Sequence, residues 1–142
     1  MNRLLIVSNR LPINITKRKE RFSVKSSVGG LATGLSSFYK SYNSLWIGWA
    51  GTSIISKEKQ DLESKLISEY RCVPVNIPQS YLDKYYNGFC NKTIWPLFHY
   101  FPQYTVYNDT YWEAYKRVNQ IFFEKLSKIM KNIIWIINGG RV

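Results

Sequence analysis

The stretch LLIVSNRLP, residues 4–12, decides the fold of this 142-residue chain. Its first five residues form an apolar run without alternation, which is typical of a strand buried on both faces in a parallel sheet. Arg10 follows almost at once and Pro12 stands close behind, so we expect Arg10 in the loop at the carboxyl end of this strand. Ligands bind at that edge of open α/β sheets, where an arginine can hold a phosphate through two parallel hydrogen bonds. The alternative is an arginine that only lies over the sheet edge.

Strand and helix patterns alternate along the rest of the chain, without a repeat or a linker. The patterns predict an exposed hairpin or a flexible loop at 13–25 and strands at 45–49, 71–77 and 133–137. They predict helices at 31–42, at 56–70 with Ser56 as the cap, at 80–89 with a Ser80–Asp83 capping box, and at 109–130 with Asp109 as the cap. Asn91 and Pro96 should break the chain before a second short helical piece.

This alternation indicates one layered α/β domain with a mostly parallel sheet. The predicted strand at 133–137 has no covering helix after it. We therefore expect it to be exposed and open to oligomerisation or to docking on a partner.

Gly29 and Gly30 stand directly before a helical pattern that begins at Leu31. Such a pair allows close backbone approach, and a helix that it opens presents free N–H groups and a positive dipole end to an anion. The spacing is neither GxGxxG nor a Walker loop, so a plain loop-to-helix turn is the more frequent explanation.

Aromatic residues are concentrated in YLDKYYNGFCNKTIWPLFHY, residues 81–100, which also holds the chain's single histidine, His99. Seven aromatic rings in this stretch exceed what one buried helical stripe uses. Rings with hydroxyl and amide groups between them suit a sugar, although the same rings could simply pack a small core. Trp46 and Trp49 fall on opposite faces of their predicted strand, so we expect one of them to line a cleft.

The net charge of +11 narrows the range of partners. Compositional drift with solvated loops, a phosphate-bearing small ligand and a nucleic acid could each account for it, and we disfavour the nucleic acid because no recognisable motif accompanies the charge. The sequence holds no apolar run long enough to span a membrane, so we expect no membrane partner. Cys72 and Cys90 lack metal-ligand spacing, which favours free thiols, a cytoplasmic location and neither metal nor cofactor.

Three segments together resemble the trehalose-6-phosphate synthase family, the retaining glucosyltransferases of the two-domain GT-B type. They are LLIVSNRLP at 4–12, VGGLATGL at 28–35 with LWIGWAG at 45–51, and YYNGFCNKTIWPLFHY at 85–100. The resemblance covers residues 3–136. It implies that residues 1–142 form a Rossmann-like, acceptor-binding amino-terminal domain. It also implies glucose transfer from UDP-glucose to glucose 6-phosphate, without a metal.

The resemblance also implies roles for single residues. Arg10 matches the arginine that contacts the acceptor phosphate, and Tyr86 and Trp95 match the acceptor-site aromatics, with Trp49 near them. Gly29 and Gly30 match the pair beside the donor's sugar-phosphate. No catalytic residue is assigned in this chain.

The sequence departs from the family pattern after the segment IIWI. The family continues with His-Asp-Tyr-His-Leu, whose aspartate contacts the acceptor, whereas residues 137–140 read Ile-Asn-Gly-Gly. The carboxyl-terminal domain, with the family's arginine and lysine for the donor diphosphate, does not occur in these 142 residues. We therefore expect a truncated portion of a synthase that is inactive alone, because no clamp would stabilise the leaving diphosphate. The alternative is a non-catalytic module that binds a sugar phosphate or docks on a partner.

Overall fold

The computed structural model describes residues 4–18, 21–27, 30–35, 42–52 and 59–137. They fall into two compact units, Met1–Asn76 and Ile77–Val142. Gly29, Ser56, the predicted helical positions 36–41 and the departing residues 138–140 lie outside the described residues.

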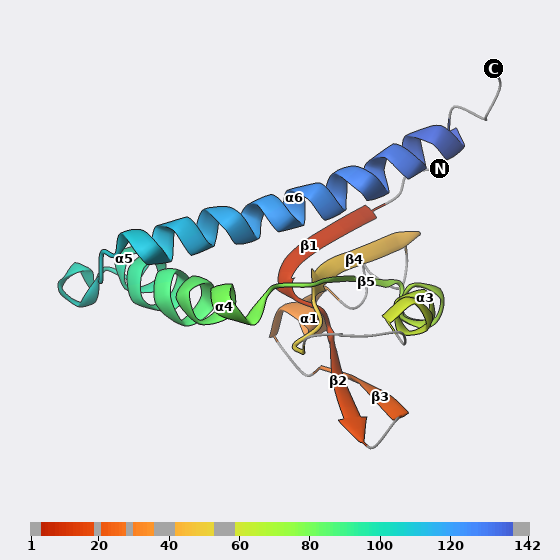
Figure 1. Cartoon of the computed structure of the whole chain (residues 1–142), viewed down its shortest axis with the longest axis horizontal. Helices are drawn as coiled ribbons and strands as arrows, with labels where there is room; N and C mark the ends of the chain where they lie inside the picture. Colours follow the sequence, from red (N-terminus) through yellow and green to blue (C-terminus); the bar gives the residue numbers. More distant parts are fainter. Residues whose placement is uncertain (1–3, 19–20, 28–29, 36–41, 53–58, 138–142) are drawn as a thin grey trace. The chain divides into compact units, whose positions relative to one another are not determined.

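Three parallel strands form the sheet of the first unit, in the order β1 (Leu4–Arg10), β4 (Ser44–Trp49) and β5 (Cys72–Val75) (Figure 1). β5 is buried throughout and β4 at every residue but its last, in agreement with their unbroken apolar character. The parallel pairing predicted from these runs is confirmed. The predicted burial of the first strand on both faces is wrong, because β1 has no fully buried residue. Arg10 was predicted in the loop after the first strand, but it is the last residue of β1, one position earlier.

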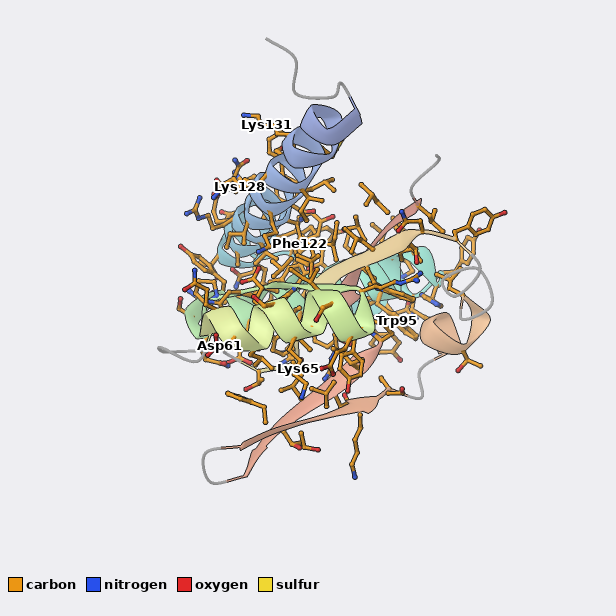
Figure 2. All side chains as sticks on the ribbon, turned by 90° about the vertical axis from the view of Figure 1, so that its right-hand side faces the viewer. Asp61, Lys65, Trp95, Phe122, Lys128 and Lys131 are labelled. Atoms are coloured by element: carbon orange, nitrogen blue, oxygen red, sulfur yellow. The ribbon has the colours of Figure 1, made fainter. Side chains whose placement is uncertain are left out.

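Helix α3 (Lys59–Tyr70) connects β4 to β5 and packs on β5. Leu62 and Leu66 point into the core, whereas Asp61 and Lys65 lie on the exposed side of the helix (Figure 2). The charged face that the sequence shows is therefore solvated, and the leucine stripe holds the helix against the sheet.

An antiparallel hairpin, β2 (Ile13–Arg18) and β3 (Arg21–Ser26), follows β1 and confirms the predicted hairpin. The expectation that it would be exposed is wrong for one of its faces. Ile13 and Ile15 alternate with exposed residues and are buried. The hairpin therefore contributes one face to the core of the first unit. The buried residues of this core are Leu11, Ile13, Ile15, Trp46, Ala50, Leu62, Leu66 and Cys72.

The second unit begins with a continuous helical run of α4 (Gln79–Leu82), the π-helix η1 (Asp83–Ile94) and α5 (Trp95–Phe98). The predicted capping box is wrong, because Pro78 occupies the N-cap position and no side chain caps the helix. The predicted break at Asn91 and Pro96 is also wrong. Pro96 stands in the first turn of α5, where the bonding changes from the π to the α pattern and an N–H group is dispensable.

Helix α6 (Asp109–Ile137) packs its first turns against η1 (Figure 1). The ring of Tyr115 lies 6.0 Å from that of Tyr85 and 4.6 Å from that of Phe89, measured between centroids. Asn108 caps the helix in place of the predicted Asp109, since its side-chain oxygen accepts the Thr110 N–H at 2.8 Å. The short 3₁₀ helix η2 (Pro102–Tyr104) lies in the connection from α5.

The strand predicted at 133–137 is wrong, because these residues form the end of α6. No glycine or proline stands between Asp109 and Ile137, so nothing in the sequence interrupts the backbone hydrogen bonds of the helix. A five-residue apolar run cannot by itself be told from part of a helix. The described residues contain no strand after β5, and the exposed edge that we expected to serve for docking is therefore absent from them.

Candidate functional site

Arg10 and Trp49 meet at the carboxyl ends of β1 and β4. The strands pair them directly, and the guanidinium carbon of Arg10 lies 5.4 Å from the centroid of the Trp49 ring. This is cation–π distance, so the ring holds the cation while its N–H groups stay available. Within the described part of the chain no carboxylate lies at ion-pair distance from Arg10. The structure thus brings together two of the residues predicted for the acceptor.

Gly51 completes this corner, although sequence reasoning assigned it no role. Its φ of +82° lies in the left-handed region. A Cβ atom at this position would stand 2.5 Å from Nη2 of Arg10. The guanidinium therefore occupies the space that any larger residue would need. A glycine two residues after the end of a predicted strand was the signal that could have found it.

The backbone of Arg10 is fixed by a short chain of hydrogen bonds. Trp46 donates its indole Nε1–H to Oγ of Ser8 at 2.7 Å, and the Ser8 hydroxyl donates to the Arg10 carbonyl at 2.6 Å. On the other side of the same peptide group, the N–H of Leu11 donates to the Trp49 carbonyl at 2.9 Å. Both polar groups of the Arg10–Leu11 peptide are therefore satisfied.

Gly48 lets β1 and β4 approach closely at this point. A Cβ atom there would lie 2.9 Å from three backbone atoms: the Arg10 carbonyl carbon, the Leu11 nitrogen and the Ser8 oxygen. The strand register also shifts between Val7 and Arg10, as at a β-bulge. Such bulges re-aim side chains at the ends of strands, and this one lies just before Arg10.

The two tryptophans of β4 have different environments, as predicted from their opposite faces. Trp46 belongs to the core, with 1% of its surface exposed, whereas Trp49 is half-buried beside Arg10. The Nε1 atom of Trp49 has no hydrogen-bond partner in the described part of the chain. The Trp49 side chain is therefore held beside Arg10 by the contact between its ring and the guanidinium, and not by a hydrogen bond from the indole.

Gly30 is the first residue of the five-residue helix α1 (Gly30–Gly34) and is exposed. The Ser27 N–H donates to the Pro12 carbonyl at 2.8 Å, which ties the segment before α1 to the chain just after Arg10. No atom lies within 4 Å of the place that a Cβ of Gly30 would take. Its space is therefore open, and its role toward a donor, like that of Gly29, stays a prediction.

Tyr86 and Trp95 are both exposed, and their spacing along the helical run of the second unit indicates that they share one side of it. A π-helix closes i→i+5 hydrogen bonds and has about 4.4 residues per turn, so nine residues make about two turns. Tyr86 is 40% exposed and Trp95 is 52% exposed, whereas Tyr85 and Phe89 turn toward α6. The aromatic stretch thus divides, with some rings in the core and others open to a ligand.

His99 stacks on Trp95, a contact that sequence reasoning missed. The two rings lie 4.0 Å apart at an interplanar angle of 15°. Nδ1 of His99 lies 2.7 Å from the Trp95 carbonyl oxygen. Since a carbonyl only accepts, Nδ1 of His99 is the donor in this hydrogen bond. The spacing of four residues on a helix was the available signal.

Buried Tyr85 and half-buried Cys90 interact with each other on η1. Burial raises the pKa of the Tyr85 hydroxyl, and it also raises the pKa of the Cys90 thiol. Both groups are therefore neutral near pH 7 and belong to the packing of the second unit. Cys72 and Cys90 are free thiols. Among the described residues no three His, Cys, Asp or Glu side chains are grouped so that they could hold a metal ion.

Residues 2–138 match the sequence profile described as Glycosyltransferase family 20. The chain belongs to this family. It is 41% identical over 137 residues to alpha,alpha-trehalose-phosphate synthase [UDP-forming] 1 of Aspergillus niger, which covers 94% of this chain and 26% of that protein. It is also 36% identical to the 56 kDa subunit of the Saccharomyces cerevisiae alpha,alpha-trehalose-phosphate synthase [UDP-forming]. That match covers 94% of this chain and 28% of the yeast subunit.

Family 20 structures have the same fold. A UDP-forming alpha,alpha-trehalose-phosphate synthase from Burkholderia xenovorans, solved in complex with glucose-6-phosphate, matches with a TM-score of 0.64 and 28% identity. The match covers 90% of this chain and 26% of that one. The predicted Rossmann-like α/β class and the predicted family are confirmed. The chain spans about a quarter of the length of the curated relatives it matches.

The four residues predicted to hold the acceptor are divided between the two units of this family 20 chain. Arg10 and Trp49 lie in the first, and Tyr86 and Trp95 in the second. Their meeting at one ligand stays a prediction. In the part of the chain that the structure describes, no helix has the length and apolar character needed to cross a membrane.

Proposed function

We propose that this chain is the acceptor-binding domain, residues 1–142, of a UDP-forming alpha,alpha-trehalose-phosphate synthase. The whole enzyme would transfer glucose from UDP-glucose to glucose 6-phosphate. Membership of family 20 supports this, as do the names of the relatives and the Burkholderia xenovorans structure with glucose-6-phosphate.

The observation that carries the proposal is the exposed guanidinium of Arg10 at the carboxyl end of β1. It rests on Trp49 and against Gly51, and no described carboxylate neutralises it. A phosphate monoester is a matching partner, because its oxygens accept two parallel hydrogen bonds from the planar guanidinium. The net charge of +11 adds a long-range attraction for such an anion.

The sugar ring of the acceptor would contact aromatic side chains. Tyr86 and Trp95 are exposed, and aromatic faces pack well against the C–H groups of a hexose. Trp49 would lie near the phosphate end. Gly29 and Gly30 would approach the sugar-phosphate of UDP-glucose, and the site would need neither metal nor cofactor. A cytoplasmic location agrees with the free thiols of Cys72 and Cys90.

Calorimetric titration of the 142-residue chain with glucose 6-phosphate tests the proposal. We expect binding, and we expect Arg10→Ala to weaken it by about tenfold to a hundredfold, since a hydrogen bond to a charged group contributes about 1.5–3 kcal/mol. Lys65→Ala is the matched control, because it removes an exposed cation of the same unit from α3. Absence of binding, or equal affinity of the Arg10→Ala variant, would refute the proposal.

A second assay addresses catalysis. We expect no release of UDP when the 142-residue chain is mixed with UDP-glucose and glucose 6-phosphate. The family resemblance places the groups that stabilise the leaving diphosphate in sequence beyond these residues. Steady UDP release by the purified chain would contradict the division of roles proposed for this domain.

A further inference from the structure

We propose that Ser8 and Gly51 are positioning residues for phosphate recognition, each acting through Arg10. This inference rests on the proposed function, because it names the groups that fix the phosphate-binding guanidinium. Ser8 fixes the backbone of Arg10. Gly51, which has no side chain, leaves the space that the guanidinium of Arg10 occupies.

The hydrogen bonds through Ser8 have only one possible direction. An indole N–H only donates and a carbonyl only accepts, so the Ser8 hydroxyl must accept from Trp46 and donate to the Arg10 carbonyl. Trp46 is itself fixed in the core with 1% of its surface exposed. Ser8 therefore links the backbone of Arg10, the last residue of β1, to a side chain that is fixed in the core.

The side chain of Arg10 needs a second constraint, because a long flexible side chain loses entropy when it is held. Trp49 contacts the cation at 5.4 Å, and the backbone of Gly51 lies where a Cβ atom would come within 2.5 Å of Nη2. Alanine at 51 would displace the guanidinium and would also strain a backbone with φ of +82°. A guanidinium held in advance binds its anion with a smaller loss of entropy.

The test is a set of titrations with glucose 6-phosphate. We expect Ser8→Ala to weaken binding by about threefold to tenfold, as for one hydrogen bond, and Gly51→Ala to weaken it by about tenfold or more. Ser8→Thr retains the hydroxyl and should restore most of the affinity. Ser68→Ala is the matched control, since the hydroxyl of Ser68 also donates to a backbone carbonyl, that of Lys65, on α3.

Double variants separate positioning from a general loss of structure. In an Arg10→Ala background, Ser8→Ala should cause no further loss of affinity, because the group on which it acts is absent. A loss that persists in this background would overturn the inference. Wild-type affinity in both Ser8→Ala and Gly51→Ala would overturn it as well.

Two further results distinguish a failure of this inference from a misfolded variant and from a failure of the proposed function. If Ser8→Ala does not fold by circular dichroism, Ser8→Cys replaces it, because the thiol has a similar shape but is a weak hydrogen-bond donor and acceptor. If the wild-type chain does not bind glucose 6-phosphate, or if Arg10→Ala binds it equally well, the proposed function itself fails and this inference fails with it. Binding that depends on Arg10 but not on Ser8 or Gly51 refutes the inference alone.

Discussion

Replacement of Gly48 by alanine should destabilise the first unit more than any other glycine-to-alanine change there that leaves φ unstrained. The added Cβ would lie 2.9 Å from three backbone atoms of β1 and the residue after it, whereas ordinary contacts begin at 3.4 Å. Backbone atoms in a paired strand cannot move aside as a side-chain end can. The two strands would therefore have to separate at the carboxyl end of β1, beside Arg10.

The magnitude follows from the cost of overpacking, which is about 1–3 kcal/mol for one extra group in a well-packed interior. We expect the upper end, about 3 kcal/mol, because all three close neighbours are backbone atoms. In a unit of this size, 1 kcal/mol corresponds to about 4–8 °C in Tm, so Tm should fall by about 12–24 °C. Thermal unfolding followed by circular dichroism measures this shift.

Gly34→Ala provides the control for this experiment. No atom lies within 4 Å of its added Cβ, and its φ is not in the left-handed region. This variant should be unchanged or more stable by about 0.4–1 kcal/mol, because alanine restricts the unfolded chain. If Gly48→Ala unfolds within about 0.5 kcal/mol of the wild type, which is the range of neutral substitutions, β1 and β4 do not approach as described.

Three further predictions concern the second unit. Gly88→Ala would place its Cβ 2.8 Å from the Tyr111 ring, and urea unfolding should show a loss of about 1–3 kcal/mol. Asn108→Ala removes the cap of α6 and should cost about 1 kcal/mol by the same measurement, whereas Asn108→Ser should cost less. Because burial raises the pKa of Tyr85 above its usual value near 10, stability should be retained below pH 10 and fall above it, and Tyr85→Phe should lessen that fall in a pH series.

The sheet of the first unit was predictable because its strands are short, continuous apolar runs bounded by polar or turn residues. Such runs favour burial on both faces, which the parallel sheet gives to β4 and β5 but not to β1, where Val7 is 48% exposed. The placement of Arg10 at the end of β1 followed from the same pattern, with an error of one residue. The hairpin β2–β3 followed from the alternation of Ile13 and Ile15 with polar residues.

The details around Arg10 could not be predicted, because they depend on pairing between distant residues. Ser8 and Trp46 are 38 positions apart, and only the register of β1 against β4 brings them together. The space requirement at Gly48 arises from that register as well. A lone sequence contains glycines for many reasons, and the pattern alone does not identify which of them faces a neighbouring backbone.

The errors in the second unit have a different cause. A break between two short helices was expected at Asn91 and Pro96 because these residues usually end helices, yet a π-helix passes directly into α5 at this point. The strand predicted at 133–137 rested on a short apolar run, and such a run fits the end of a long helix as well as a buried strand.

If Tyr86 and Trp95 bind the acceptor as proposed, the π form of η1 makes that binding depend on the type of helix. In an α-helix with 3.6 residues per turn, positions 86 and 95 would be two and a half turns apart, and the two rings would face opposite directions. A hexose that touches both rings can therefore bind only while the wide helix persists. By mass action such a ligand would hold the segment in its wide form, and a mutation that tightened the helix would abolish the shared contact without changing either aromatic residue.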